Sequence, residues 1–213
     1  MNLWLIPKDF YSLCLINIMK NQSFQFSRRK KQQLMKNDRS LKQSIDSRIK
    51  DLCGKINKNE NYYTTSSCSG RIVLFRNIKE KRDDVILFSW HNTISLGLLK
   101  QELDKIIKEN KSKGLLYFKQ EPCILHVGCR NLQDAQRMHD LAKNAGWKRC
   151  GIIASKKRFI VELNGTERLE FPIINNGKML VDDNFLKIIV KEANKKLEES
   201  WKKIERLERT IEK

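Results

Sequence analysis

The feature that most constrains the fold is a stripe of apolar residues along the last segment, from Asp183 to Lys213. The apolar positions recur every three or four residues, so they gather on one face of a helix. These positions are Leu186, Ile189, Val190, Ala193, Leu197, Trp201, Ile204, Leu207 and Ile211. Oppositely charged pairs four residues apart on the polar face, such as Glu198 with Lys202 and Glu199 with Lys203, favour the same helix. We expect this helix to lie across a β-sheet; a basic arm that binds RNA is the alternative.

Upstream of this helix, strand and helix patterns alternate irregularly. Strands are predicted at 71–75, 85–89, 115–118, 123–129, 152–154, 159–163 and 168–173, and helices at 94–110 and 132–145. A basic helical pattern covers 27–57, where Asp38 and Asp46 are placed to cap helix starts, whereas 61–69 is predicted as a hydroxyl-rich loop. Several connections have hairpin length. This favours one compact α+β domain with a mixed or largely antiparallel sheet, N-terminal helices and a long C-terminal helix.

The N-terminal residues are expected to stand apart from that domain. Residues 1–19 are apolar, but Lys8 and Asp9 interrupt them, so they are too short and too charged to span a bilayer and make a poor signal peptide. We predict a disordered extension over residues 1–22 and one domain over residues 23–213.

The charge balance points to a polyanionic partner. The 213 residues contain 43 Lys and Arg against 25 Asp and Glu, a formal net charge of +18, and 40% of them are hydrophobic. A basic excess of this size favours nucleic acid over an acidic membrane surface. A soluble basic protein with no such partner is the alternative.

The cysteines exclude two classes of protein. None of the six forms a CxxC pair, which argues against a zinc site with the usual ligand spacing, and a chain of this size needs no disulfide scaffold. Cys123 and His126 are three residues apart, a spacing that is more typical of buried strand residues than of a metal site. We therefore predict a cytoplasmic protein without a bound metal.

The segment richest in chemical groups runs from Thr64 to Arg71, with the sequence TTSSCSGR. Its hydroxyls and backbone N–H groups can turn toward an anion, Gly70 would allow a close approach, and Arg71 would add a bidentate donor. It is not a Walker loop, because the GxxxxGK spacing is missing. Ordinary turn chemistry before a strand is the alternative interpretation.

Titratable candidates lie elsewhere in the chain. His126 is predicted on the opposite strand face from Leu125 and Val127, and His91 follows a strand end, where site residues are common. His139 falls in the middle of a helix and is expected to face solvent. No glycine-rich strand-to-helix turn of the dinucleotide-binding type is present, so a classical Rossmann fold is not expected.

Several motifs, in order, resemble the tRNA wybutosine-synthesizing protein 3 family. The run YTTSSCSGRI at 63–72 looks like the family signature TTSSC(S/A)GR, and FKQEPCILHV at 118–127 resembles its F-K-x-E-P-x-x-L-H-V strand pair. Agreement continues through CRNLQDA at 129–135, GTERLE at 165–170 and the segment from 177 to 206. Trp90, before His91, is bulkier than the usual family residue.

The resemblance implies a function that composition does not reach. It implies transfer of a methyl group from S-adenosylmethionine to a ring nitrogen of the tricyclic base 3′ of the anticodon in phenylalanine tRNA. The implied catalytic residues are Asp46 and His126, either of which could take the proton that the nitrogen loses. The implied residues for binding substrate or donor are Ser66, Ser67, Cys68, Gly70, Arg71 and His91.

Two rival functions follow from the same residues. One is a non-catalytic RNA-binding protein that uses its basic surface alone. The other is a hydrolase built on Cys68 and His126, which would need a third member that the sequence does not identify. A monomer is assumed in each case.

Overall fold

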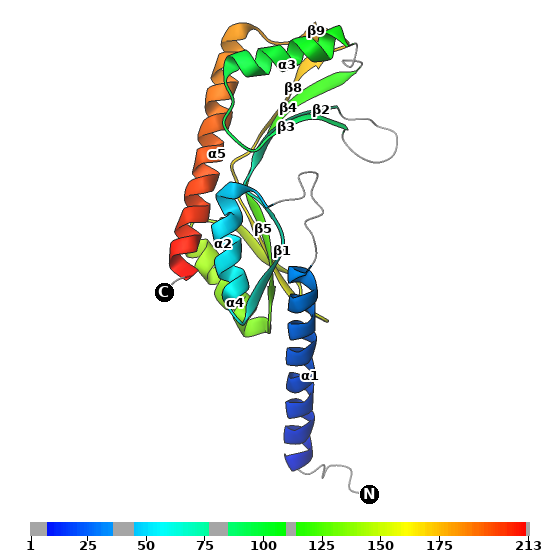
Figure 1. Ribbon diagram of the computed structural model, residues 1–213, viewed down its shortest axis with the longest axis vertical. Helices are drawn as coiled ribbons and strands as arrows, with labels where there is room; N and C mark the ends of the chain where they lie inside the picture. Colours follow the sequence, from blue (N-terminus) through cyan, green and yellow to red (C-terminus); the bar gives the residue numbers. More distant parts are fainter. Residues whose placement is uncertain (1–7, 36–44, 77–84, 110–113, 212–213) are drawn as a thin grey trace, which may run out of the picture.

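The computed structural model describes residues 8–35, 45–76, 85–109 and 114–211, and it contains two antiparallel sheets with helices packed around them (Figure 1). Its helices are α1 (Lys8–Leu34), α2 (Ser47–Lys58), α3 (Leu96–Lys108), α4 (Leu132–Asn144) and α5 (Asp183–Ile211). Its strands are β1 (Tyr62–Cys68), β2 (Arg71–Arg76), β3 (Val85–Trp90), β4 (Leu115–Glu121), β5 (Ile124–Cys129), β6 (Arg149–Ala154), β7 (Phe159–Asn164), β8 (Leu169–Asn175) and β9 (Lys178–Met179).

The chain crosses between the two sheets at one junction. The first sheet has the order β1-β5-β7-β6 and the second the order β3-β2-β4-β8-β9. The connections β1 to β2, β4 to β5 and β7 to β8 each leave one sheet and enter the other. The prediction of an α+β fold without Rossmann topology is confirmed. The structure has two antiparallel sheets where one was expected, because the chain passes from one sheet to the other at these three connections.

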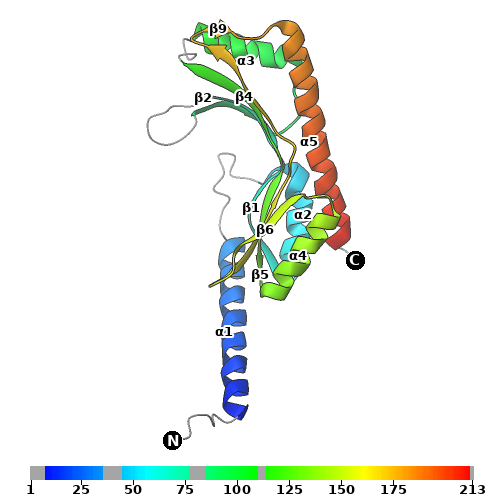
Figure 2. The same ribbon diagram turned by 180° about the vertical axis from the view of Figure 1, so that it is seen from behind.

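Helix α5 lies along both sheets, as Figures 1 and 2 show from opposite sides. Its apolar stripe is buried from Leu186 to Leu207 and contacts α2, α3, α4 and β4, which confirms the prediction for this segment. Lys203 departs from the expected wet face: it is buried and binds the carboxylate of Glu167 at the junction. A buried ammonium needs such a partner.

Two local expectations need correction, and two others lie beyond the part of the chain that the structure describes. The hydroxyl-rich segment 61–69 is strand β1 over most of its length, because pairing with β5 satisfies its backbone. Helix α1 extends back to Lys8, whereas residues 1–22 were expected to be disordered. Asp38 and the charged turn near 79–84 lie outside the described residues. Among the described residues, no helix combines the length and the apolar character needed to cross a membrane.

Gly70 lies at the junction in a conformation that suits glycine. Its φ is +97°, and a Cβ there would lie 3.1 Å from the Glu121 carbonyl oxygen and 3.1 Å from Leu197 Cδ2. Gly70 therefore lets β1 pass into β2 directly against β4 and α5. The sequence analysis expected Gly70 to allow an anion to approach closely; in the structure, the backbone of Glu121 makes that close approach.

Gly70→Ala is expected to lower the free energy of unfolding by about 2 kcal/mol, because positive φ costs an L-residue roughly 1–2 kcal/mol and the contacts add strain. Urea unfolding followed by circular dichroism would measure the change. Gly54→Ala in α2 is the matched control: nothing lies within 4 Å of its added Cβ, so it should stabilise by about 0.5–1 kcal/mol. Equal effects of the two substitutions would contradict this role for Gly70.

Candidate active site

The site is built on the face of the first sheet that lies opposite its helix-covered core. Leu125 and Val127 are fully buried on the core side of β5, where α4 and α2 pack on the sheet. Alternation along a strand therefore places His126 on the other face. The register pairs Ser66 with His126, and Cys68 follows two residues later on the same face of β1. Ser66, Cys68 and His126 therefore lie on the same face of the sheet.

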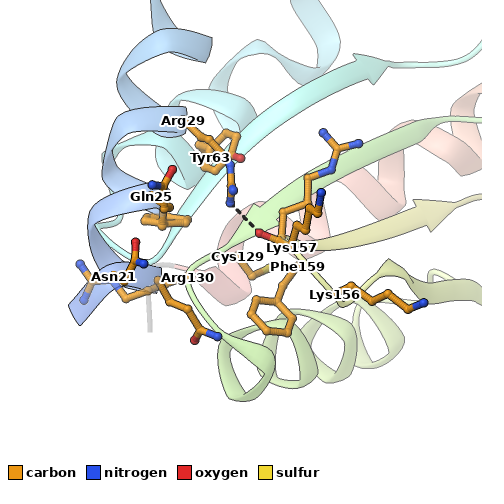
Figure 3. Close-up of a pocket in the computed structure, with 12 residues that line it drawn as sticks. Asn21, Gln25, Arg29, Tyr63, Cys129, Arg130, Lys156, Lys157 and Phe159 are labelled. Carbon is orange, nitrogen blue, oxygen red and sulfur yellow. Dashed lines mark hydrogen bonds between the residues drawn. The ribbon is translucent and has the colours of Figure 1, made fainter. Parts of the chain in front are cut away.

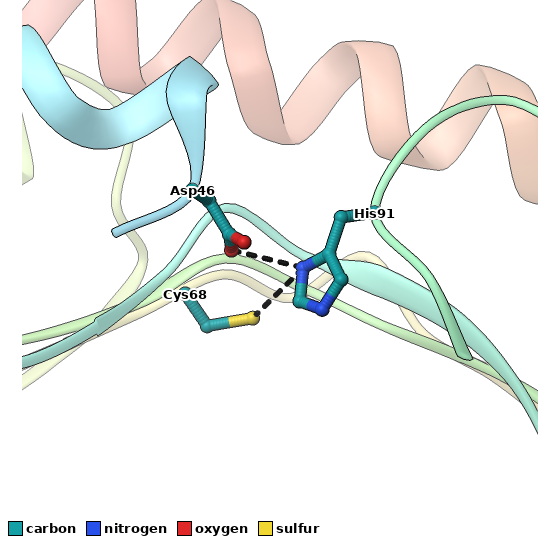
Figure 4. A group of neighbouring side chains, drawn as sticks. All are labelled: Asp46, Cys68 and His91. Atoms are coloured by element: carbon teal, nitrogen blue, oxygen red, sulfur yellow. Dashed lines mark hydrogen bonds and ion pairs between the residues drawn. The ribbon is translucent and has the colours of Figure 1, made fainter. Parts of the chain in front are cut away.

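Asp46, His91 and Cys68 form the first cluster, at the sheet junction (Figure 4). Asp46 precedes α2 at its N-cap position, but its side chain does not cap the helix. Its Oδ2 accepts hydrogen bonds from the backbone N–H and the hydroxyl of Ser69, at 3.0 and 3.2 Å, and lies 2.9 Å from His91 Nδ1. Cys68 Sγ lies 4.0 Å from the same His91 nitrogen.

Asp46 is held as an anion. Burial by itself raises the pKa of this carboxyl, but the hydrogen bonds from His91 and Ser69 outweigh burial and lower the pKa to about 2. An ionised carboxylate can only accept, so the hydrogen bond requires the proton on His91 Nδ1. Nε2 of His91 is then the basic nitrogen, and it has no hydrogen-bond partner within the described residues. A carboxylate with so low a pKa is itself a weak base.

Cys68 is a thiol at neutral pH, because burial raises its pKa to about 11. It makes no hydrogen bond with His126, whose two nitrogens bond other residues, so the described part of the chain does not assemble the Cys68–His126 pair of the hydrolase alternative. Asp46, Cys68 and His91 each offer one atom that could bind a metal ion, and these three atoms lie within 4.8 Å of one another. A protonated thiol and a carboxylate already hydrogen-bonded to His91 fit such an ion poorly.

His126 belongs to a second cluster on the same face. Its Nδ1 lies 2.7 Å from Ser66 Oγ and its Nε2 lies 2.8 Å from Glu162 Oε2. The Glu162 carboxylate accepts from Nε2–H, so Nδ1 accepts the hydroxyl proton of Ser66. Both nitrogens of His126 are therefore occupied, in contrast to His91.

Arg71 is tied to the second sheet. It is paired with Glu121 in register, and its Nε lies 2.6 Å from Glu121 Oε2. Burial on its own would raise the Glu121 pKa, but the bonds from Arg71 and Lys119 lower it. The salt bridge uses Nε, and the two terminal nitrogens of Arg71 make no hydrogen bond with another described residue.

Sequence reasoning missed three partners and misplaced one residue. Glu162, Glu121 and Ser69 hold His126, Arg71 and Asp46, yet none was a candidate. Glu162 had a signal: alternation with Val161 and Leu163 puts it on the outer face beside His126. Ser67 lies on the other face of β1, where its hydroxyl contacts the Cys53 thiol of α2. It is therefore separated from Ser66 and Cys68.

Comparison with known proteins identifies the family. A sequence model of the family described as "Methyltransferase TYW3" matches residues 27–213. The chain belongs to this family. It is 37% identical to the tRNA wybutosine-synthesizing protein 3 homolog of Xenopus laevis over 194 residues, which cover 88% of this chain and 75% of the relative.

Archaeal relatives agree in sequence and structure. The chain is 38% identical over 191 residues to a Pyrococcus furiosus protein named tRNA(Phe) 7-((3-amino-3-carboxypropyl)-4-demethylwyosine(37)-N(4))-methyltransferase 1, covering 88% of this chain and 95% of that one. A solved structure from Pyrococcus horikoshii superposes with a TM-score of 0.80 at 36% identity, covering 89% of this chain and 97% of the other.

Membership of the family decides between the rival functions. The chain is a methyltransferase, which replaces both the purely RNA-binding alternative and the hydrolase. As a methyltransferase it needs a methyl donor. The roles of individual site residues and the domain limit at residue 22 stay predictions.

Proposed function

We propose that this chain transfers a methyl group from S-adenosylmethionine to a ring nitrogen of the wyosine-type base 3′ of the anticodon in phenylalanine tRNA, with His91 as the proton acceptor. The names of the relatives support the substrate, and the formal charge of +18 suits a polyanion. The observation that carries the proposal is the Asp46–His91 pair, whose histidine presents a basic Nε2 without a partner among the described residues.

The proton acceptor follows from the geometry of the two histidines. A ring N–H that becomes methylated must lose its proton, and a base within hydrogen-bond reach accelerates that loss. Asp46 fixes the His91 tautomer and stabilises the imidazolium that forms, as the carboxylate does in other acid–histidine pairs. His126 has no nitrogen left for this task, so we assign it, with Glu162, the role of orienting the Ser66 hydroxyl toward the substrate.

The remaining residues fit a role in binding. When bound, S-adenosylmethionine supplies an electrophilic methyl group with a positive charge on sulfur. The ionised Asp46 and the Glu162 carboxylate flank the open face and would favour that charge. Arg71, fixed by Glu121, directs its outer nitrogens to a substrate phosphate, and position contributes much of the rate. We retain the expectations of a cytoplasmic monomer without a metal.

The test is methyl transfer from labelled S-adenosylmethionine to phenylalanine tRNA purified from cells blocked at this step. We expect label to enter only this tRNA, and not phenylalanine tRNA from unblocked cells, because the latter already carries the methyl group. Mapping the label to the wyosine-type base establishes the substrate. Absence of incorporation by folded protein would reject the proposed reaction.

A further inference from the structure

A pocket lies on the same open face of the first sheet, and its lining does not include Asp46 or His91. It encloses about 280 Å³ between α1, the outer face of β1 and β5, and the β6–β7 turn at 155–158 (Figure 3). Arg29 of α1 donates a 2.9 Å hydrogen bond to the Lys157 carbonyl and so joins two of these walls. The pocket is therefore formed by the folded chain itself.

The lining is strongly basic. None of its residues is acidic, and five are cationic: Arg29, Arg130, Lys156, Lys157 and Arg158. No salt bridge neutralises any of these five within the described residues. Two carboxylates outside the lining interact with nearby cations: Asp134 of α4 with Arg130, and Glu60 with Lys30. Unneutralised cations in a concavity concentrate the positive potential there.

One buried arginine nitrogen in this lining has no hydrogen-bond acceptor among the described residues. Arg130 packs over the Phe26 ring at 5.9 Å, which holds the side chain in place. Its Nε is buried and has no hydrogen-bond partner in the described part of the chain. A buried donor without an acceptor is unfavourable, and a bound anion would supply the missing acceptor.

The pocket floor is closely packed and adjoins the proposed catalytic face. The Tyr63 ring lies on Gly128, where an added Cβ would come within 2.4 Å of the ring, and Phe26 packs on Tyr63 at 5.4 Å. Gly128 follows His126 by two residues on β5, and two residues of a strand rise about 7 Å. A strand of substrate that reaches His126 and Ser66 thus passes the basic pocket.

We propose that this pocket binds the phosphodiester backbone of the RNA strand beside the nucleotide that is methylated. This inference rests on the proposed function for the identity of the RNA. The methyl donor is an unsuitable occupant, because five cations repel its sulfonium. A phosphodiester supplies the acceptor oxygens that Arg and Lys bind with charge-assisted hydrogen bonds. The pocket therefore adds affinity and register, and it takes no part in the chemical step.

The test compares two triple variants of the full chain. Lys156→Ala/Lys157→Ala/Arg158→Ala removes the exposed turn cations, and Lys187→Ala/Lys191→Ala/Lys195→Ala removes the same charge from the exposed face of α5. Fluorescence anisotropy with phenylalanine tRNA gives Kd over a range of salt concentrations. We expect the turn variant to raise Kd about tenfold or more and to reduce the slope of log K against log salt by about 0.7 for each phosphate that the variant no longer neutralises. The α5 variant should change both much less.

The outcomes separate this inference from the proposed reaction. An unchanged Kd and salt slope in the turn variant, with methyl transfer by the wild type intact, would overturn the pocket and leave the reaction standing. Weaker binding by the turn variant supports the pocket even if the wild type transfers no methyl group, which would reject only the reaction. Inorganic phosphate and AMP are added as competitors: displacement of tRNA by micromolar amounts of either would overturn the assignment to an RNA strand in favour of a small phosphate ligand.

Discussion

His91→Ala is expected to lower kcat for methyl transfer by about 10²–10⁴-fold, the contribution typical of a positioned general base. The reason is structural: Asp46 lies 2.9 Å from Nδ1, so Nε2 of His91 is free to take the proton from the substrate nitrogen. The measurement is single-turnover methyl transfer to phenylalanine tRNA from blocked cells. The Kd for that tRNA should change little, because the lost group acts in the chemical step.

Two further substitutions make this prediction specific. His91→Gln keeps an amide donor for Asp46 but cannot accept a proton, so it should lose as much activity as alanine while preserving the fold. His139→Ala on α4 is the matched control, since this histidine contacts Asp140 away from the site. We expect His126→Ala to reduce kcat less than His91→Ala; the reverse order would transfer the role of base to the His126–Glu162 pair.

Asp46→Asn is expected to have the second largest effect, a loss of at least about 100-fold in kcat, because a neutral amide neither fixes the His91 tautomer nor stabilises imidazolium. Near-normal turnover by Asp46→Asn or Asp46→Ala would refute the role.

The same carboxylate is expected to stabilise the fold. Its pKa is lowered from 3.8 to about 2 in the folded chain, so its contribution is fully present above the unfolded value and is lost as pH falls through the folded one. The size is roughly 2 kcal/mol at neutral pH. Urea unfolding of wild type and Asp46→Asn at pH 7 and near pH 2 should show a difference that narrows in acid. A constant difference would contradict the linkage.

The sequence alone determined much of the architecture. The apolar stripe from Leu186 to Leu207 predicted α5, because periodicity is a local property that burial on one face enforces. The motif at 63–72 and the strand histidine His126 pointed to the family and to most of the site residues. The hydroxyl-rich segment was placed in a loop because its serines and threonines show no apolar alternation; pairing with β5 makes it a strand.

The tertiary structure alone decided which groups act together. Asp46 and His91 are far apart in sequence, and they meet because the β1–β2 crossing at Gly70 brings the start of α2 and the end of β3 to one junction. The same folding separates His126 from Asp46 by giving it Ser66 and Glu162 as partners, and it joins α1 to the β6–β7 turn around the basic pocket. Such pairings depend on long-range register and crossing geometry. Residue type and spacing encode each strand's faces, but they do not encode which strands meet.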